Sequence, residues 1–327
     1  MRRTVHAVLF CFVLISLCLA FFGCENIPAD DEKITVVATI FPEYDWVKQM
    51  MGDSADKIDI HLLLDSGVDM HSYQGTAKDM LTVTTCDLLI CVGGSSDAWI
   101  EDALANAQNK DMQVVRLLDV LGDSAHFEEH AEGMQSGGHH HEEDKTDALD
   151  EHVWLSLKNA ELFCHAIADK LALLLPKEAD IIRQNERNYC DALNALDKDY
   201  RLAVQNTKHP TLLFADRFPF LYLAKDYAIP YYAAFSGCAS LEAEATPATR
   251  IFLANKVDEL GVTCLLQTES GNDRLPQAIK ESAKTGNSLR VLTLDSMQSV
   301  TADRINEGLT YLSVMQKNLE VLKIAFE

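Results

Sequence analysis

Short apolar runs alternate with amphipathic segments along the chain from residue 34 onward. A run is predicted to be a strand where it is short enough, where apolar and polar residues alternate, or where glycines end it. These runs are 34–40, 57–64, 87–94, 113–118, 210–215, 229–235, 262–267 and 290–295. Helices are predicted between and after them, for example at 76–86 and 303–326. The alternation of strands with helices predicts an α/β protein with mainly parallel sheets.

The stretch between the two groups of strands is helical in pattern from about Glu151 to Lys208. In its second part the apolar residues recur every three, four or seven positions, at Ile182, Tyr189, Leu193, Leu196 and Tyr200. A helix of roughly 30 residues is about 45 Å long at 1.5 Å per residue. Such a helix could join two lobes as a stiff strut.

The N-terminus has the pattern of a secretory signal. Met1-Arg2-Arg3 precedes an apolar run that ends at Gly23-Cys24 and is too short for a comfortable membrane span. The Gly-Cys junction resembles a bacterial lipobox, which implies cleavage before Cys24, a lipid on its sulfur and an extracytoplasmic protein anchored to the cell membrane. Plain secretion and an uncleaved anchor are the alternatives. The predicted organisation is a signal peptide (1–23), a tether (24–33), a first lobe (34–174) with a polar loop (122–148), a linker helix (175–207) and a second lobe (208–327).

The chain is strongly acidic. It has 28 basic and 50 acidic residues and a net charge of −22, and loss of Arg2 and Arg3 with the signal leaves 26 against 50, or −24. This balance argues against nucleic acid or an anionic lipid surface as a partner, and it permits a cationic ligand. Six cysteines follow Cys24, mostly in apolar settings, and no CxxC pair exists. They are predicted to be buried thiols rather than disulfides or a cysteine zinc site.

Several metal-binding side chains follow predicted strands. His71 comes after the strand 57–64, Asp216 after 210–215 and Glu269 after 262–267, while Asp295 ends the last strand. Ligands of open α/β sheets sit at the carboxyl ends of the strands, so these groups could converge on one cleft. Imidazoles with carboxylates suit Zn²⁺, Mn²⁺ or Fe²⁺. Two other histidines, His61 and His165, fall within apolar patterns and are predicted to be structural.

Four stretches, in this order, resemble the metal-receptor subunits of bacterial ABC importers: ATIFPEYDWVKQMMG, LLLDSGVDMHSYQGTAKDM, DLLICVGGSSDAWI and DEHVWLSLKNA. The resemblance runs from about residue 34 to the C-terminus. It implies two α/β lobes hinged by a single rigid helix, and a monomer that passes zinc, manganese or iron to an ABC permease and its ATPase. It also implies three ligands: His71 of VDMHSYQGT, His152 of DEHVW and Asp295 of LTLD.

The family has a further ligand, the third along the chain, between the positions of His152 and Asp295. Its motif departs from the usual pattern in this sequence. The family motif has the form H-x-A-F-x-Y-F, and the corresponding text is ADRFPFLYL. Alignment without a gap places Arg217 at the ligand position, and a guanidinium cannot bind a cation. A shift of one residue supplies Asp216, which we predict to be the ligand. Glu269 and Glu244 are the alternatives.

The loop 122–148 contains five histidines, at His126, His130, His139, His140 and His141. Zinc receptors of this family carry a mobile histidine-rich loop in this segment, so these residues are predicted to hold metal weakly. A solvated linker or an accidental cluster is the alternative. His152 differs, because it lies beside Trp154, which could fix its ring by packing.

These features favour a zinc receptor that is not an enzyme. The two-histidine, two-carboxylate set resembles the manganese and iron receptors of the family, but a histidine-rich loop has little use for Mn²⁺. A secreted zinc hydrolase is an alternative from another class, although the chain has no HExxH pair and no G-x-S-x-G elbow. A metal-buffering adhesin is a further alternative.

Overall fold

The computed structural model describes residues 33–135, 148–208, 210–240 and 243–327. The helices and strands given below belong to the unit Ile34–Glu327. The predicted signal peptide, most of the tether with Cys24, and His139, His140 and His141 lie outside the described residues. None of the helices in the described part of the chain combines the length and the apolar composition needed to cross a membrane.

The first lobe is built on a four-stranded parallel sheet with the order β2-β1-β3-β4. Val36 at its centre pairs with Ile60 on one side and Leu88 on the other. Its strands are β1 (Ile34–Ala38), β2 (Ile58–Leu62), β3 (Leu88–Cys91) and β4 (Gln113–Arg116). Its helices are α2 (Phe41–Met51), α3 (Ala77–Thr85), α4 (Ala98–Ala105) and α5 (Leu117–Leu121).

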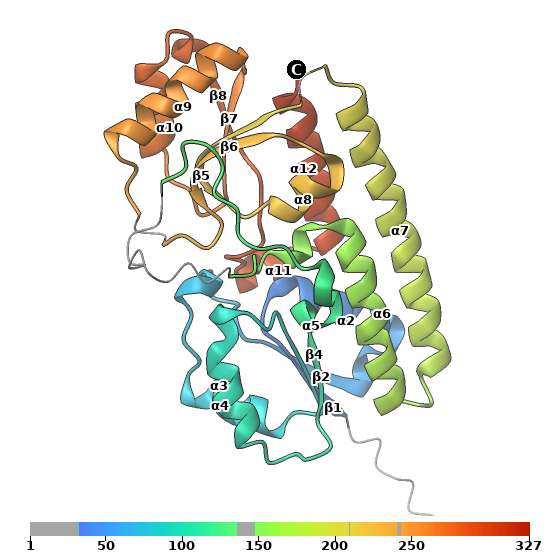
Figure 1. Ribbon diagram of the computed structural model, residues 1–327. Helices are drawn as coiled ribbons and strands as arrows, with labels where there is room; N and C mark the ends of the chain where they lie inside the picture. The colour runs from blue at the N-terminus through green and yellow to red at the C-terminus, as the bar shows by residue number, and fades with distance from the viewer. Residues whose placement is uncertain (1–32, 136–147, 209, 241–242) are drawn as a thin grey trace, which may run out of the picture. The chain divides into compact units, whose positions relative to one another are not determined.

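The second lobe repeats this arrangement with a parallel sheet of order β6-β5-β7-β8 (Figure 1). Its strands are β5 (Leu212–Phe218), β6 (Tyr231–Ser236), β7 (Cys264–Gln267) and β8 (Arg290–Thr293). Its helices are α8 (Leu221–Tyr227), α9 (Pro247–Leu260) and α10 (Arg274–Ser282). The prediction of an α/β fold with two parallel sheets is confirmed, because each predicted strand contains or overlaps an observed one. In both sheets the first strand lies between the second and the third, which creates a topological switch point beside it.

Short 3₁₀ helices shape the loops between these elements. They are η1 (Gly52–Lys57), η2 (Met70–Ser72), η3 (Ser95–Asp97), η4 (Gly122–Ser124), η5 (Val153–Leu155) and η6 (Gly286–Ser288). Three of them, η2, η3 and η5, lie in the loops that carry the candidate functional residues. The sheets therefore supply a rigid base, and tight turns fix the side chains that extend from it.

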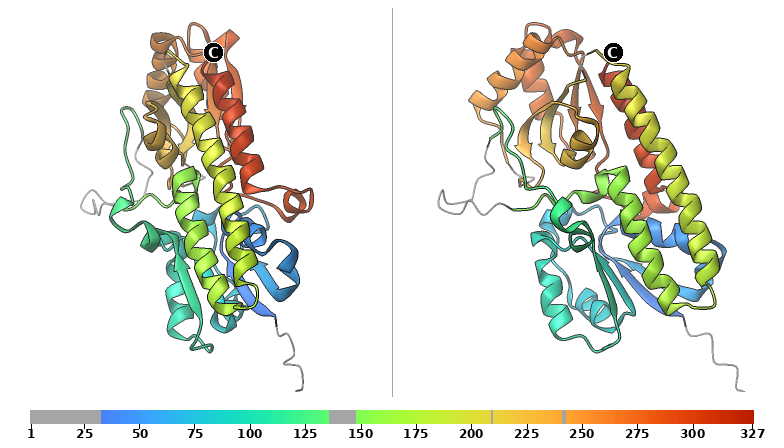
Figure 2. Two further views of the ribbon diagram at one scale, coloured as in Figure 1. Left: turned by 90° about the vertical axis from the view of Figure 1, so that its right-hand side faces the viewer. Right: turned by 45° about the vertical axis from the view of Figure 1, so that its right-hand side comes forward.

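Helices α6 (Leu157–Leu174) and α7 (Ala179–Gln205) connect the two halves of the chain. All five positions of the predicted apolar stripe on α7 are buried. Asn185 near its start donates to the Met50 carbonyl at 2.9 Å, and the Tyr200 hydroxyl donates to the Met315 carbonyl at 2.6 Å. Met50 belongs to α2 of the first lobe and Met315 to the C-terminal helix. Helix α7 therefore contacts both the first lobe and the C-terminal helix (Figures 1 and 2).

The prediction of one continuous helix over 303–326 is wrong. The structure has α11 (Ala302–Asn306) and α12 (Tyr311–Ala325). Gly308 between them has a φ of 92°, a conformation that side-chain-bearing residues rarely adopt. The Thr310 side chain then accepts the Ser313 N–H at 3.1 Å and caps the new helix. The break lets α12 turn back along α7 (Figure 2).

The core is continuous between the lobes. Trp46 of α2 packs against Phe163 of α6, with ring centroids 5.8 Å apart, and against Tyr311 of α12 at 5.2 Å. Tyr311 also donates its N–H to the Asp45 carboxylate at 2.8 Å and its hydroxyl to the Trp154 carbonyl at 2.6 Å. The C-terminal helix is thereby fixed to the first lobe beside the segment that carries His152.

Residues 122–135 of the polar loop contact the second lobe through hydrogen bonds and an ion pair. Gln135 donates its N–H to the Ala234 carbonyl at 2.9 Å and forms an isolated bridge with Phe235 of β6. Glu129 forms an ion pair with Lys225 of α8. This segment leaves the first sheet and crosses to the second lobe. We name residues 122–135 the strap.

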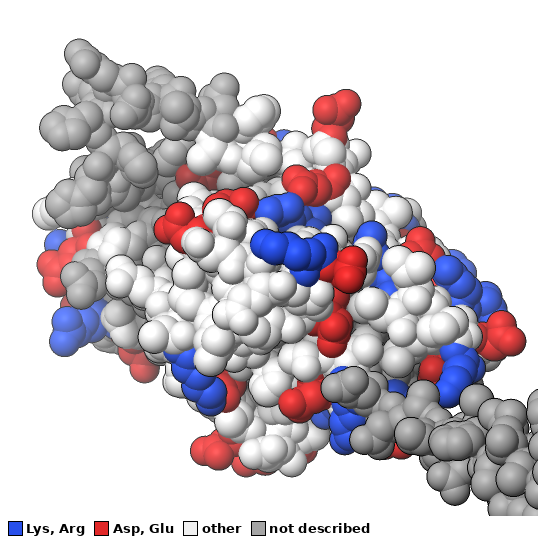
Figure 3. Space-filling view, turned by 90° about the horizontal axis from the view of Figure 1, so that it is seen from below, with Lys and Arg blue, Asp and Glu red and all other residues white. Residues whose placement is uncertain are grey.

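Charged side chains of both signs are interspersed on the face shown in Figure 3. The described residues there do not gather into one broad patch of basic charge.

Candidate metal centre

His71 is fixed by the turn that follows β2. It lies within η2, and its N–H donates to the Asp69 carboxylate at 3.0 Å. Its ring nitrogen Nδ1 lies 2.9 Å from the Ser96 hydroxyl, which belongs to η3 after β3. Loops at the carboxyl ends of two strands therefore orient one imidazole.

His152 is fully buried and immediately precedes η5. Asp150 holds it twice, because one carboxylate oxygen accepts the His152 N–H at 2.9 Å and lies 3.0 Å from its Nδ1. The ring packs against Trp154 with centroids 5.4 Å apart, as the sequence suggested. Trp154 in turn donates its Nε1–H to the Ser296 carbonyl of the second lobe at 2.8 Å.

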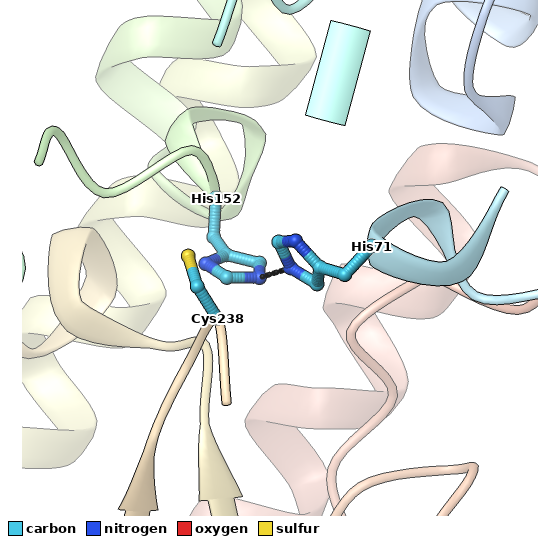
Figure 4. Close-up of side chains that lie close together, drawn as sticks. All are labelled: His71, His152 and Cys238. Carbon is cyan, nitrogen blue, oxygen red and sulfur yellow. Dashed lines mark hydrogen bonds between the residues drawn. The ribbon is translucent and has the colours of Figure 1, made fainter. Parts of the chain in front are cut away.

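The two imidazoles face each other through their Nε2 atoms, which lie 3.1 Å apart (Figure 4). In both rings the other nitrogen, Nδ1, is engaged by an outer group, Ser96 for His71 and Asp150 for His152. Metal-binding histidines show this pattern, since the outer partner fixes the tautomer and turns the free lone pair toward the ion. The arrangement can hold a cation between the two Nε2 atoms.

Cys238 is the third potential ligand at this point. One ligand atom from each of His71, His152 and Cys238 lies within 4.8 Å of the others. Cys238 belongs to the loop after β6, so the second lobe contributes it (Figure 4). No motif in the sequence distinguishes Cys238 from the other cysteines. The other five cysteines after Cys24 are buried and free, as predicted.

The electrostatics keep His71 in its metal-binding form. Burial, with His152 close by, lowers the pKa of His71 to about 4. Burial alone would also lower the pKa of His152, but the Asp150 carboxylate against its Nδ1 raises it. Burial raises the pKa of the Cys238 thiol well above its usual value. A neutral imidazole at His71 has a lone pair available for a cation.

Arg217 occupies a buried position between the lobes. It donates to the Asp69 carboxylate at 2.8 Å and to the Ser270 hydroxyl at 3.2 Å, and its side chain is 3% exposed. Asp69 is the residue that caps the turn of His71, so the ion pair ties β5 of the second lobe to the His71 loop. Although burial opposes it, Arg217 lowers the pKa of Asp69 and keeps the pair ionised.

Among the described residues, Asp216 does not belong to the group of His71 and His152. One of its carboxylate oxygens accepts the Thr268 N–H at 3.0 Å and the Thr268 hydroxyl at 2.5 Å. Asp216 also lines a cavity of about 420 Å³ in the second lobe, together with Ser240 and Arg274. No group of three potential ligands within the described residues contains Asp216, so its role as a ligand stays a prediction.

The other predicted carboxylates are also engaged elsewhere. Asp295 accepts the Met297 N–H at 2.9 Å and forms an ion pair with Arg304. Glu269 accepts the N–H groups of Ser296 and Gln298 at 2.7 and 3.0 Å, and burial together with Asp295 raises its pKa. Glu244 is exposed, and its carbonyl accepts from the Gln135 side chain at 3.1 Å. In the described chain, none of the three joins the group at His71 and His152.

The described histidines of the polar loop lie on the strap. The His126 N–H donates to the Tyr222 hydroxyl at 3.0 Å, and its ring packs against Tyr222 with centroids 5.1 Å apart. His130 is exposed. The proposed weak metal binding by His126, His130 and the three histidines outside the described residues stays a prediction.

A second group of potential ligands lies between α6 and α7. It comprises Glu161, His165 and Cys190, and His165 also forms an ion pair with Glu186. The side chain of His165 is 52% exposed and that of His61 is 42% exposed, so neither lies in the core although the sequence around each is apolar. Both have carboxylate partners, Asp59 for His61 and Glu161 and Glu186 for His165, and a structural role for them stays a prediction.

Three comparisons with known proteins bear on this geometry. A family model described as zinc-uptake complex component A, periplasmic, matches residues 36–325. The zinc-binding lipoprotein AdcA of Streptococcus pneumoniae is 28% identical over 316 residues, which cover 95% of this chain and 60% of that protein. The metal ABC transporter substrate-binding lipoprotein SsaB of Streptococcus sanguinis is 28% identical over 320 residues, or 94% of each chain.

A solved structure agrees with the fold. The Zn(II)-bound ZnuA-like domain of Streptococcus pneumoniae AdcA matches with a TM-score of 0.69 and 24% identity, over 90% of this chain and 99% of that one. The chain spans 60% of the length of AdcA itself, so it corresponds to one part of that protein. The architecture of two α/β lobes is common to both.

The buried ion pair predicts a large effect on stability. Arg217→Met should lower the free energy of unfolding by about 3–5 kcal/mol, because it leaves the buried Asp69 carboxylate without its partner. Urea unfolding followed by circular dichroism measures this. The exposed pair of Arg183 and Asp169 is the control, and Arg183→Met should cost less than about 1 kcal/mol. Equal losses in the two variants would contradict the interpretation.

Proposed function

Because the chain belongs to the zinc-uptake complex component A family, we propose that it captures a divalent metal ion, Zn²⁺ first, and delivers it to an ABC permease and its ATPase. The observation that carries this proposal is the 3.1 Å separation of the Nε2 atoms of His71 and His152. Each ring has its Nδ1 engaged by an outer partner, which leaves the facing nitrogens for an ion. The protein acts as a receptor and not as an enzyme.

The separation suits zinc. Two nitrogens bound to one tetrahedral Zn²⁺ at 2.0–2.1 Å lie about 3.3 Å apart, close to the 3.1 Å between the two Nε2 atoms. Zinc, manganese and iron can all take imidazole ligands, so the histidines alone do not choose among them. The name of one relative favours zinc, since AdcA is called zinc-binding.

We further infer that the mature protein is an extracytoplasmic monomer held to the membrane by a lipid on Cys24. The support is the sequence of its N-terminus and the word lipoprotein in the names of AdcA and SsaB. Light scattering of the protein without its signal peptide should give the mass of one chain.

The lipid anchor can be tested in cells. Cys24→Ala should move the protein from the membrane fraction into the medium or the periplasm, because the sulfur that carries the lipid is gone. Cell fractionation with immunoblotting measures the distribution, and Cys86→Ala serves as a control that keeps the wild-type location. If Cys24→Ala stays in the membrane fraction, the anchor is an uncleaved signal instead.

The tight site can be tested by removing either imidazole. His71→Ala and His152→Ala should each weaken Zn²⁺ binding at least tenfold, or about 1.4 kcal/mol, because each removes one bond to the ion. Calorimetry on protein stripped of metal measures the affinity, and circular dichroism checks that each variant is folded. The exposed His61 gives the matched control, and His61→Ala should bind as the wild type does. Wild-type affinity in a folded His71→Ala variant would exclude this site.

The proposed auxiliary loop has a separate test. Replacement of His139, His140 and His141 by alanine should remove weak additional Zn²⁺ equivalents and leave one tight equivalent unchanged. Ligands that must lose conformational entropy to bind an ion hold it more weakly than ligands that are already fixed in place. Competition with a zinc chelator separates the two classes of site. Loss of the tight equivalent would mean that these histidines are ligands of the tight site.

A further inference from the structure

We propose that the Cys238 thiolate is the third ligand of the metal site, beside His71 and His152, and that it makes the receptor selective for a thiophilic cation such as Zn²⁺ over Mn²⁺. This inference rests on the proposed function and deepens it. It replaces the histidine or carboxylate that the family pattern predicts after β5 with a sulfur from the loop after β6.

The position of the sulfur is the first support. Its distance from one ring nitrogen of each of His71 and His152 is within 4.8 Å. A nitrogen and a sulfur on one tetrahedral Zn²⁺ lie about 3.6 Å apart, from bond lengths of about 2.05 and 2.3 Å. The sulfur is thus near enough for rotation about the Cα–Cβ bond of Cys238 to adjust its position toward a bound ion.

The backbone around Cys238 is shaped to bring it to the histidines. A Cβ on the preceding Gly237 would lie 2.8 Å from Cε1 of His152 and 3.0 Å from the Phe218 carbonyl, so only glycine allows this approach. The Cys238 N–H donates to the Glu128 carboxylate at 3.0 Å. Glu128 belongs to the strap, which thus holds the loop after β6 against the first lobe.

The competing oxygen ligands are already engaged. Arg217 stands at the position that the family motif gives to a ligand, and it forms an ion pair with Asp69 instead. Asp216 accepts two hydrogen bonds from Thr268. Each would have to give up these contacts to bind an ion. The Cys238 sulfur interacts with the backbone N–H of Glu151, a bond that a metal-bound sulfur can keep through another lone pair.

A thiolate also brings charge to the ion directly. Imidazole ligands bring none, and the nearby carboxylates of Asp150 and Glu151 are held by other donors. A thiolate supplies one negative charge directly on the metal. The balance is simple, because Cys238–SH loses its proton to solvent as the S–metal bond forms, and no oxidant or reductant is needed.

The thiolate determines the preference for the metal. Soft sulfur ligands select Zn²⁺ over Mn²⁺, which prefers carboxylate, carbonyl and water oxygens. A site of two imidazoles and one thiolate should therefore bind Zn²⁺ and Co²⁺ tightly and Mn²⁺ poorly. The second lobe would thus provide the ligand that discriminates, while the first lobe provides the two that do not.

Cobalt gives a direct spectroscopic test. Co²⁺ added to the metal-free, reduced protein should produce a near-ultraviolet thiolate-to-cobalt charge-transfer band at one equivalent. Cys238→Ser should abolish this band and weaken Zn²⁺ binding at least tenfold, while Mn²⁺ binding changes little. Cys238→Ala should behave in the same way and guards against a new hydroxyl ligand. Cys264→Ser, at a buried thiol in β7, is the matched control and should keep the band.

Four results would overturn the inference. The band could persist in Cys238→Ser, or it could be absent from a wild-type protein that binds Co²⁺ through His71 and His152. The band could instead vanish in Cys190→Ser, which would place the thiolate between α6 and α7. If Asp216→Ala lost affinity and Cys238→Ser did not, the third ligand would be Asp216. Failure of the wild type to bind Zn²⁺ or Co²⁺ would overturn the proposed function itself.

Discussion

The approach of two buried imidazoles to 3.1 Å, one from His71 and one from His152, is the contact on which the rest of the site depends. Two rings whose free nitrogens face each other gain little on their own, so the surrounding structure must hold them. It does so from outside, through Ser96 on one ring and Asp150 on the other. Both outer groups come from loops at the carboxyl edge of the first sheet or from the segment before α6. The four-stranded parallel sheet is therefore the base from which this contact is built.

The second lobe completes the site from the opposite side. Its contacts with the first lobe are specific and polar near the histidines, namely the buried pair of Arg217 with Asp69 and the bond from Trp154 to the Ser296 carbonyl. Farther away, α7 and α12 join the lobes through the apolar core. Because Asp69 also caps the turn of His71, a movement of the second lobe would shift the imidazole of His71. Capture and release of an ion can therefore be coupled to the relation between the lobes.

The sequence predicted the sheets well because their strands are short, buried and apolar. Its motifs singled out His71 and His152, and the structure brings the two rings together. It could not place the third ligand. The register of β5 against β6 shifts between Phe214 and Arg217, and a one-residue change of register moves a side chain to the other face. No local pattern reveals such an irregularity, so Asp216 and Arg217 could not be told apart. Cys238 was not singled out because its neighbours Gly237 and Ala239 form no metal-binding motif with it, and its spatial partners lie far away in the chain.

The charges around the proposed site explain why a dication would suit it. Three carboxylates, of Asp69, Asp150 and Glu151, lie close to the two histidines, and each is occupied by a different donor. Asp69 is neutralised by Arg217, and Asp150 lies against Nδ1 of His152. Glu151 accepts from Ser95 and Ser96, bonds that lower its pKa although burial opposes them.

None of the three carboxylates therefore needs to reach the ion in order to favour it. After the cancellation of Asp69 by Arg217, Asp150 and Glu151 leave two negative charges beside the two rings. In a buried setting this field is weakly screened and favours a divalent cation over a monovalent one. The carboxylates would favour a divalent charge. The ligand atoms that contact the ion would then determine which divalent metal is bound.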